Sequence, residues 1–129
     1  MQKTRGFTLL EILVVIGIIA VLIGMGVASF STAQKKARDA KRKADLQAVQ
    51  KFMEQCYSIN SYQYPDLTSM VGNGTPSLTI TCPADSTTIA VADPTLTKVY
   101  TVTISVSGAD YSVSLPLELG SSYTVTQQQ

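Results

Sequence analysis

One carboxylate stands out because it interrupts the longest apolar stretch of the chain. Glu11 is the only charged residue between Phe7 and Phe30, a run of 24 residues without proline. A carboxylate costs roughly 2.5–3.5 kcal/mol at the centre of a membrane, and less near an end of the helix, where it can reach the interface. Two interpretations stay open: a tolerated interfacial side chain, or a group that meets a cation once the helix leaves lipid.

The other residues that could do chemistry are few. The chain has two cysteines and no histidine, which excludes a histidine base and the common histidine-containing and four-cysteine zinc sites. Asp85 and Asp93 lack the dense oxygen-ligand pattern of a calcium loop, so no metal site is predicted. The sequence contains no nucleophile elbow, phosphate loop or carboxylate pair, and we expect neither an enzyme nor a bound cofactor.

The apolar run is long enough to span a bilayer. As a helix it measures about 36 Å, against a hydrocarbon core of about 30 Å. Lys3 and Arg5 precede it, as in a signal peptide, but the run exceeds the 7–15 apolar residues of such peptides and no Ala-x-Ala cleavage site follows. A plain membrane anchor would explain neither Glu11 nor the abrupt Arg5-Gly6-Phe7 junction.

Gly6-Phe7-Thr8-Leu9-Leu10-Glu11, after a short basic leader and before the apolar run, closely resembles the N-terminus of type IV pilins and type II secretion pseudopilins. The resemblance implies cleavage after Gly6 by a membrane-embedded prepilin peptidase and N-methylation of Phe7. It also implies that Glu11 pairs with the new amino group of Phe7 on a neighbouring subunit. An unpaired carboxylate in a dry filament core would be very costly, whereas a paired one is tolerable.

Small residues recur in the apolar run at Ala20, Gly24 and Ala28. This stripe either lets helices approach closely or reflects only the abundance of small residues in membrane helices, and both interpretations stay open. Many type IV pilins have a proline at the position of Ala28. Gly24 and Gly26 could weaken the helix there instead, at about 1 kcal/mol each.

Residues 31–57 are predicted to continue the helix. They carry seven Lys or Arg and three acidic residues, whereas residues 58–129 carry one Lys and five acidic residues. The basic residues fit a solvated, ion-paired helix face, a seam for the acidic heads of adjacent subunits, or a contact with anionic lipid. Nucleic acid is not favoured, because no aromatic residues are interleaved with them. The predicted i,i+4 ion pairs are Lys35–Asp39, Asp39–Lys43 and Lys41–Asp45.

Two side-chain patterns follow this helix. Val49, Phe52, Met53 and Cys56 form an apolar surface that should pack on a sheet. A narrower stripe consists of alanines at helical spacing, namely Ala33, Ala37, Ala40, Ala44 and Ala48.

Residues 58–129 are predicted to form a small antiparallel β-sheet. Asn73-Gly74 and Gly108-Ala109-Asp110 are turn signals, and Pro116 limits its strand to an edge or an ending. Alternation of apolar with Ser and Thr residues predicts strands over 78–82, 89–91, 98–107, 111–115 and 122–126.

The predicted fold is therefore α+β and pilin-like: a long N-terminal helix, transmembrane in its first half, packed on a small antiparallel sheet. The expected divisions are a leader at 1–6, a membrane and filament-core helix at 7–30, its amphipathic continuation at 31–57 and a β-sheet head at 58–129.

Cys56 and Cys82 could close a loop of 25 intervening residues. The export that the resemblance implies favours oxidation. A disulfide and two buried thiols both stay open.

The resemblance implies a structural subunit of a type IV pilus-like filament. Its partners would be copies of itself, the prepilin peptidase and methylase, an inner-membrane assembly platform, and membrane lipid before assembly. It would cross the inner membrane once with its head outside the cytoplasm, and then enter an extracellular or periplasmic filament. The basic residues just beyond the apolar run oppose this topology by the positive-inside rule. A pseudopilin of a secretion or DNA-uptake system and, more remotely, a monomeric membrane receptor or adhesin are the alternatives.

Overall fold

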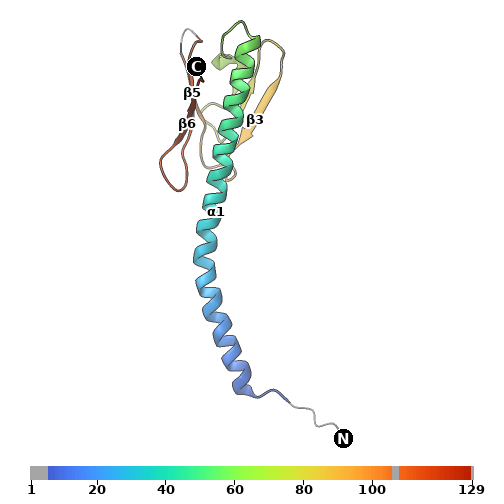
Figure 1. The fold of residues 1–129 in the computed structure, drawn as a ribbon, viewed down its shortest axis with the longest axis vertical. Helices are drawn as coiled ribbons and strands as arrows, with labels where there is room; N and C mark the ends of the chain where they lie inside the picture. Colours follow the sequence, from blue (N-terminus) through green and yellow to red (C-terminus); the bar gives the residue numbers. More distant parts are fainter. Residues whose placement is uncertain (1–5, 106–107, 129) are drawn as a thin grey trace. The chain divides into compact units, whose positions relative to one another are not determined.

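The computed structural model describes residues 6–105 and 108–128, and its first regular element is a single long helix. Helix α1 extends over Leu9–Ile59, and the chain forms two compact units, residues 1–35 and 36–129 (Figure 1). The helix continues without a break through Gly24 and Gly26. The leader expected at residues 1–6 lies outside the described part of the chain, except for Gly6.

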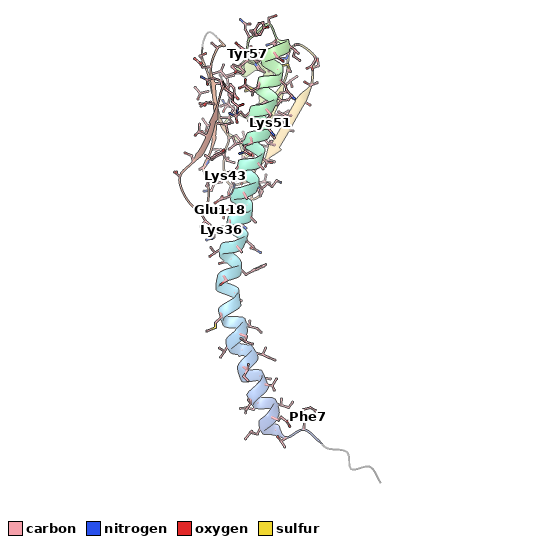
Figure 2. All side chains as sticks on the ribbon, viewed as in Figure 1. Phe7, Lys36, Lys43, Lys51, Tyr57 and Glu118 are labelled. Carbon is pink, nitrogen blue, oxygen red and sulfur yellow. A yellow bond between two sulfur atoms is a disulfide. The ribbon has the colours of Figure 1, made fainter. Side chains whose placement is uncertain are left out.

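In the first unit, α1 is apolar and its described side chains are exposed. An 18-residue window reaches a mean hydropathy of 2.8, and the helix is long and apolar enough to cross a membrane. Its large apolar side chains are between 48 % and 83 % exposed from Leu9 to Phe30, and Figure 2 draws them as sticks on this part of the helix. Such a run of exposed apolar side chains has the length and composition of a membrane-spanning helix.

In the second unit, one side of α1 carries the core. Leu46, Val49, Met53 and Cys56 are buried, and Phe52 is half-buried, as the pattern of apolar residues predicted. The alanines of the predicted stripe lie on the other side of the helix and are exposed, as are the adjacent lysines. The helix thus packs through one stripe and leaves the opposite face open.

The core is completed by two three-stranded antiparallel sheets, whereas one sheet was predicted. The first consists of β1 (Met70–Val71), β2 (Ser77–Thr81) and β3 (Thr88–Ala92), in the order β1-β2-β3. The second consists of β4 (Thr101–Ile104), β5 (Tyr111–Leu115) and β6 (Tyr123–Thr126), in the order β4-β5-β6. Figure 1 shows β3, β5 and β6 beside the C-terminal half of α1.

Alternation decides which strand side chains face the helix. In β2, Leu78 and Ile80 are fully buried, and in β5 Tyr111, Val113 and Leu115 are buried. The Ser and Thr residues between them lie on the other face, as the period-two pattern predicted.

The strand predicted over 98–107 is shorter in the structure, which begins it at Thr101 as β4. Before that point, the Tyr100 N–H donates to the Thr75 carbonyl and the Gly74 N–H donates to the Tyr100 carbonyl, so this residue pairs with the turn after β1. The Asn73 side chain similarly accepts from the Val102 N–H and donates to its carbonyl. Residues 106 and 107 of the prediction lie outside the described part of the chain.

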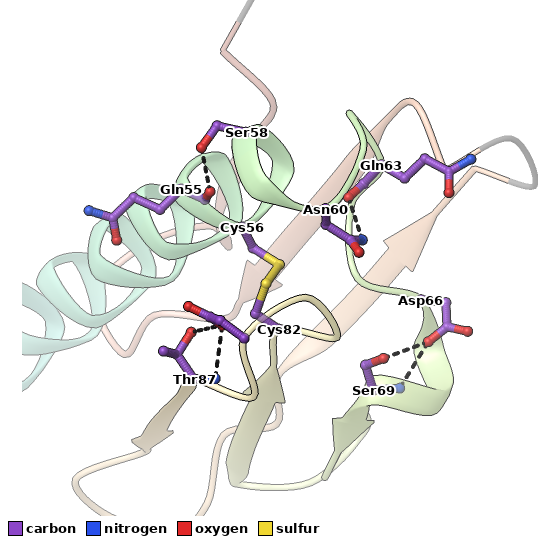
Figure 3. The surroundings of a disulfide bond; sticks show 10 residues. Gln55, Cys56, Ser58, Asn60, Gln63, Asp66, Ser69, Cys82 and Thr87 are labelled. Carbon is purple, nitrogen blue, oxygen red and sulfur yellow. Dashed lines mark hydrogen bonds between the residues drawn. A yellow bond between two sulfur atoms is a disulfide. The ribbon is translucent and has the colours of Figure 1, made fainter.

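A disulfide joins α1 to the end of β2 (Figure 3). It links Cys56 and Cys82, whose Cα atoms are 5.7 Å apart and whose side chains are buried. The bond ties the last turns of the helix to the first sheet.

Candidate functional site

The N-terminal residues that the sequence singled out lie at the start of α1. Gly6, Phe7 and Thr8 form an irregular segment just before the first helical residue, Leu9. Phe7 is 80 % exposed, and Figure 2 places it at this end of the helix. The bond between Gly6 and Phe7 therefore lies outside the helix.

Glu11 has an intrachain role that the sequence interpretation missed. Its backbone N–H donates to the Thr8 hydroxyl at 3.2 Å, and its carboxylate accepts from the Thr8 N–H at 3.5 Å. Thr8 and Glu11 thus have the spacing and the reciprocal contacts of a capping box, which satisfies donors at a helix N-terminus. The Thr-x-x-Glu spacing in the sequence was the signal for it. Glu11 also places a negative charge near the positive end of the helix dipole.

The N-terminal motif and the relatives of the chain agree with this geometry. The family model of the prokaryotic N-terminal methylation motif matches residues 1–27. The chain is 39 % identical over 64 residues to the type IV wide pilus major component PilA4 of Thermus thermophilus, which covers 50 % of the chain and 48 % of PilA4. It is 40 % identical over 64 residues to the type II secretion system core protein G of Escherichia coli, covering 50 % of the chain and 43 % of that protein.

The N-terminal half of this chain is therefore similar to that of type IV pilins and type II secretion pseudopilins. A third relative, the prepilin peptidase-dependent protein D of Escherichia coli, is 51 % identical over 37 residues, or 29 % of the chain and 25 % of that protein. The chain spans about half the length of these pilin and core protein G relatives. No solved structure matches it significantly.

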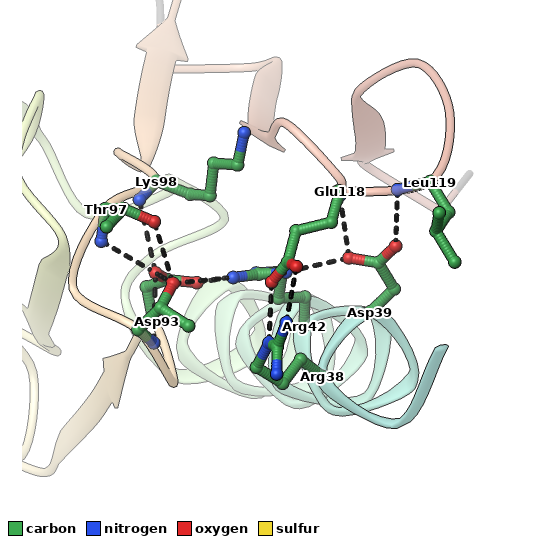
Figure 4. Close-up of polar contacts among 9 residues, drawn as sticks. Arg38, Asp39, Arg42, Asp93, Thr97, Lys98, Glu118 and Leu119 are labelled. Atoms are coloured by element: carbon green, nitrogen blue, oxygen red, sulfur yellow. Dashed lines mark hydrogen bonds and ion pairs between the residues drawn. The ribbon is translucent and has the colours of Figure 1, made fainter. Parts of the chain in front are cut away.

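In the second unit of this pilin-like chain, a buried arginine joins three carboxylates (Figure 4). Arg42 is fully buried and donates to Asp93 at 2.5 Å, to Asp39 at 2.8 Å and to Glu118 at 2.8 Å. A fourth bond, of 3.0 Å, goes to the Thr95 hydroxyl. Each partner except Asp39 comes from a loop distant in sequence, so this guanidinium connects the helix with both sheets.

The loop between β3 and β4 is organised around Asp93. The second oxygen of this buried carboxylate accepts from the Thr95 hydroxyl at 2.7 Å. It also accepts from the backbone N–H groups of Thr97 at 2.9 Å and Lys98 at 3.2 Å. With the Arg42 bond, Asp93 has the hydrogen bonds that a buried carboxylate needs.

The loop between β5 and β6 is held in the same way. Arg38 binds both oxygens of Glu118, at 2.7 and 2.6 Å, a two-pronged contact that favours arginine over lysine. Asp39 accepts from the backbone N–H groups of Glu118 and Leu119, both at 2.9 Å. We call Arg38, Asp39, Arg42, Asp93 and Glu118 the charge network.

The charge network differs from the expectations for the basic residues. None of the three interpretations placed arginines inside their own head, yet Arg42 is fully buried. The predicted i,i+4 pairs of Asp39 with Lys35 and Lys43 are wrong as well, because Asp39 pairs with Arg42. Among the described residues, no ion pair joins Lys41 to Asp45 either.

The acidic residues considered for calcium have protein partners. Asp93 belongs to the charge network, and Asp85 accepts from the backbone N–H and the hydroxyl of Thr87, at 2.9 and 2.7 Å. Within residues 6–105 and 108–128, no group of three or more potential metal ligands gathers. Neither aspartate is therefore arranged with others around a common cation.

The network keeps its carboxylates ionised. Hydrogen bonds from Arg38 and Arg42 lower the pKa of Glu118 to about 2. Burial alone would raise the pKa of Asp93, but the hydrogen bond from Arg42 and those within its loop bring it well below the usual range. Burial also opposes the charge of Arg42, but its bonds to the three carboxylates outweigh this and raise its pKa.

These shifts predict loss of stability in acid. Unfolded Asp and Glu titrate near pH 4, and the lowered folded-state pKa values mean that the network stabilises the fold above that pH. Unfolding of the full chain in detergent micelles by urea can be followed by tyrosine fluorescence. The urea concentration at the midpoint should decrease as the pH is lowered from about 5 to about 2.

Asp45 acts in the opposite direction, because burial raises its pKa, but the pKa values of Asp39, Asp93 and Glu118 are all lowered. The variant Glu118→Gln should have a flatter pH profile than the wild type. A urea midpoint that stays constant from pH 7 to pH 2.5 would contradict the assignment.

Proposed function

We propose that this chain is the precursor of a structural subunit of a type IV pilus-like filament. In this proposal it is cleaved after Gly6, N-methylated at Phe7 and polymerised through its N-terminal helix. The observation that carries the proposal is the exposed apolar surface of α1 from Leu9 to Phe30, which contains the single charge of Glu11. The matched methylation motif at residues 1–27 supports the same processing.

The physical logic is an exchange of one apolar environment for another. Before assembly, the subunit waits in the inner membrane with its head outside the cytoplasm, and lipid covers the apolar side chains. During extraction by an inner-membrane assembly platform, the same side chains come to pack on neighbouring copies. The protein is a substrate of the prepilin peptidase in this scheme, and it needs no catalytic group or cofactor of its own.

Glu11 then has two successive partners. Within one chain it caps the helix through Thr8. Cleavage would create an amino group at Phe7, one residue before this cap, where its positive charge lies at the unfavourable end of the helix dipole. In the filament, the carboxylate of Glu11 pairs with that amino group on a neighbouring subunit. This pairing makes the charge tolerable in a dry core and favours one register of the subunits.

The processing is tested by intact-mass and N-terminal analysis of protein from its native membrane. The proposal expects a product that begins at methylated Phe7, and electron microscopy should show filaments containing it. A mature product that retains Gly6, or that lacks the segment beginning at Phe7, would refute the proposal.

The two roles of Glu11 can be separated by a pair of substitutions. Glu11→Gln keeps a hydrogen-bonding side chain for the capping box but loses the charge, whereas Thr8→Val removes the capping hydroxyl and keeps the charge. We expect Glu11→Gln to insert into the membrane normally and to lose most filament yield. Thr8→Val should lose about 1 kcal/mol of helix stability and keep most of its yield. Equal losses for both variants would assign Glu11 to the cap alone.

A second candidate is a pseudopilin of a type II secretion or DNA-uptake system. Similarity to two type II secretion core proteins G, both 40 % identical over half of the chain, favours it specifically. Deletion of the gene should then abolish secretion or uptake without removing long surface filaments. A monomeric membrane receptor or adhesin predicts no processing at Gly6 and no effect of Glu11 on self-association.

A further inference from the structure

The exposed face of α1 in the second unit carries lysines without carboxylate partners. Lys36, Lys41 and Lys51 are exposed, and none of them forms an ion pair within the described residues. Figure 2 shows Lys36 and Lys51 along this part of the helix. We call these three residues the lysine face; Lys43 is left out because its ammonium lies 5.7 Å from the Tyr123 ring centre.

Within the described residues, the lysine face forms no ion pair with the acidic residues of the same helical segment, although Lys41 is near enough to Asp45 to attract it. Asp39 is 6 % exposed and belongs to the charge network. Asp45 is half-buried, and its Oδ2 atom has no hydrogen-bond partner and is shielded from solvent. Between the lysines lie Ala37, Ala40, Ala44 and Ala48, all exposed, so a partner could approach the helix closely.

The other end of the same unit carries the opposite charge. Asp66, Asp85 and Asp110 are exposed and accept hydrogen bonds from neutral donors, and none of them forms an ion pair within residues 6–105 and 108–128. We call these three residues the acidic end.

Contacts of the fold place the acidic end near the last turns of α1. Asp85 lines one cavity with Phe52 and Ile59. Asp110 binds Gln127, whose neighbour Gln128 donates its N–H to Glu54. Asp66 follows the end of the helix closely and is seen with Cys56 in Figure 3.

The two charged surfaces are separated along the helix. The lysine face is centred near residue 43 and the acidic end near residue 57, and a helix rises about 1.5 Å per residue, so about 20 Å lies between them. Copies that enter the same membrane are parallel to one another. Displacing one parallel copy along the helix axis by about this distance brings its acidic end to the lysine face of the next.

We infer that the lysine face binds the acidic end of a second copy of this chain. The inference rests on the proposed function, since it concerns contacts between neighbouring subunits of the filament. Charge complementarity of this kind chiefly sets orientation and register, because each exposed ion pair contributes only about 0.2–1 kcal/mol. Repeated along a filament, such pairs favour one arrangement of the heads over others.

Zero-length carbodiimide crosslinking of filaments, followed by mass spectrometry, tests the contact. The reagent joins only an amine and a carboxylate in direct contact. Lys36 and Lys41 lie about 24–32 Å along the helix from residue 57, so a bond from either of them to the acidic end must join two copies. We expect such bonds from Lys36 or Lys41 to Asp66, Asp85 or Asp110. Filaments that give crosslinks at other sites but none of these would overturn the inference.

Matched substitutions give a second measurement. The triple variant Lys36→Gln, Lys41→Gln, Lys51→Gln should lower filament yield about tenfold, as three modest ion pairs imply. High salt should loosen wild-type filaments for the same reason. The single variants Lys41→Gln and Lys98→Gln remove equal charge from the helix face and from the β3–β4 loop, and only the first should lower the yield.

The outcomes separate this inference from the proposed function. If wild-type protein is never processed at Gly6 and forms no filaments, the proposed function fails. If wild-type filaments form and the triple variant assembles equally well, only the inference fails. Normal assembly of the triple variant with less co-purified phosphatidylglycerol would assign the lysine face to lipid and would also overturn the inference.

Discussion

Replacement of Arg42 by methionine is expected to lower the free energy of unfolding of the head by about 3–5 kcal/mol. The change leaves a side chain of similar length but removes the cation shared by Asp39, Asp93 and Glu118. Breaking a buried ion pair by removal of one partner has this cost because the other charge stays buried without compensation. Asp93, which is 2 % exposed, cannot turn to water without moving its loop.

Circular dichroism and tyrosine fluorescence of the full chain in detergent micelles would measure the effect. A loss of that size lowers the Tm of a domain of this length by at least about 12 °C. Arg38→Met should cost less, about 1 kcal/mol, because Arg38 is partly exposed and its only ion pair among the described residues is with Glu118. The exposed neighbour Lys41→Met is the control and should change stability by no more than about 0.5 kcal/mol. A Tm for Arg42→Met within 3 °C of the control would contradict the role of the network.

Loss of the bond between Cys56 and Cys82 is expected to have the second largest effect. A loop of this size gives about 3.5 kcal/mol on the chain-entropy model, and measured values for native disulfides are typically 2–4 kcal/mol. The bond also fastens the end of α1 to β2, so its loss should free the last turns of the helix as well. The double variant Cys56→Ala, Cys82→Ala should therefore unfold at a clearly lower urea concentration than the wild type.

Reductant provides the matched control. Added after unfolding, it should lower the refolded wild type to the stability of the double variant and leave the variant unchanged. The intact mass of untreated protein should be two hydrogens below that of the reduced chain. Wild-type protein of full reduced mass, with a urea midpoint insensitive to reductant, would show that the two residues are thiols.

The elements that the sequence predicted well are those with a strong local period. The strands β3, β5 and β6 lie within one or two residues of the predicted ranges, because alternation of large apolar residues with small or polar ones is a local property. The division of the strands into two sheets was not predictable in this way. It depends on Tyr100 pairing with the turn residues Gly74 and Thr75, which interrupts the path from β3 to β4.

The role of the arginines shows where local interpretation failed and what signal it overlooked. Arg38 and Arg42 continue, at spacings of four, the stripe that runs through Leu46, Val49 and Met53 into the core. Their position on that stripe indicated that they face the head, whereas their charge suggested solvent, a partner subunit or lipid. Asp93 and Glu118 lie 51 and 76 residues after Arg42 in the sequence, so no local pattern could identify them as its partners.

The sequence by itself determined the features that depend on neighbouring residues: the apolar helix, the Gly6-Phe7 junction with Glu11 in register, and the alternating strands. These follow from local sterics, hydrophobicity and motif spacing, which the chain carries in any conformation. Only the tertiary structure decided which charges are buried together, how the strands divide into two sheets, and which face of α1 stays open with its lysines. Those outcomes depend on contacts between distant segments, where burying the one guanidinium of Arg42 fixes two loops at once.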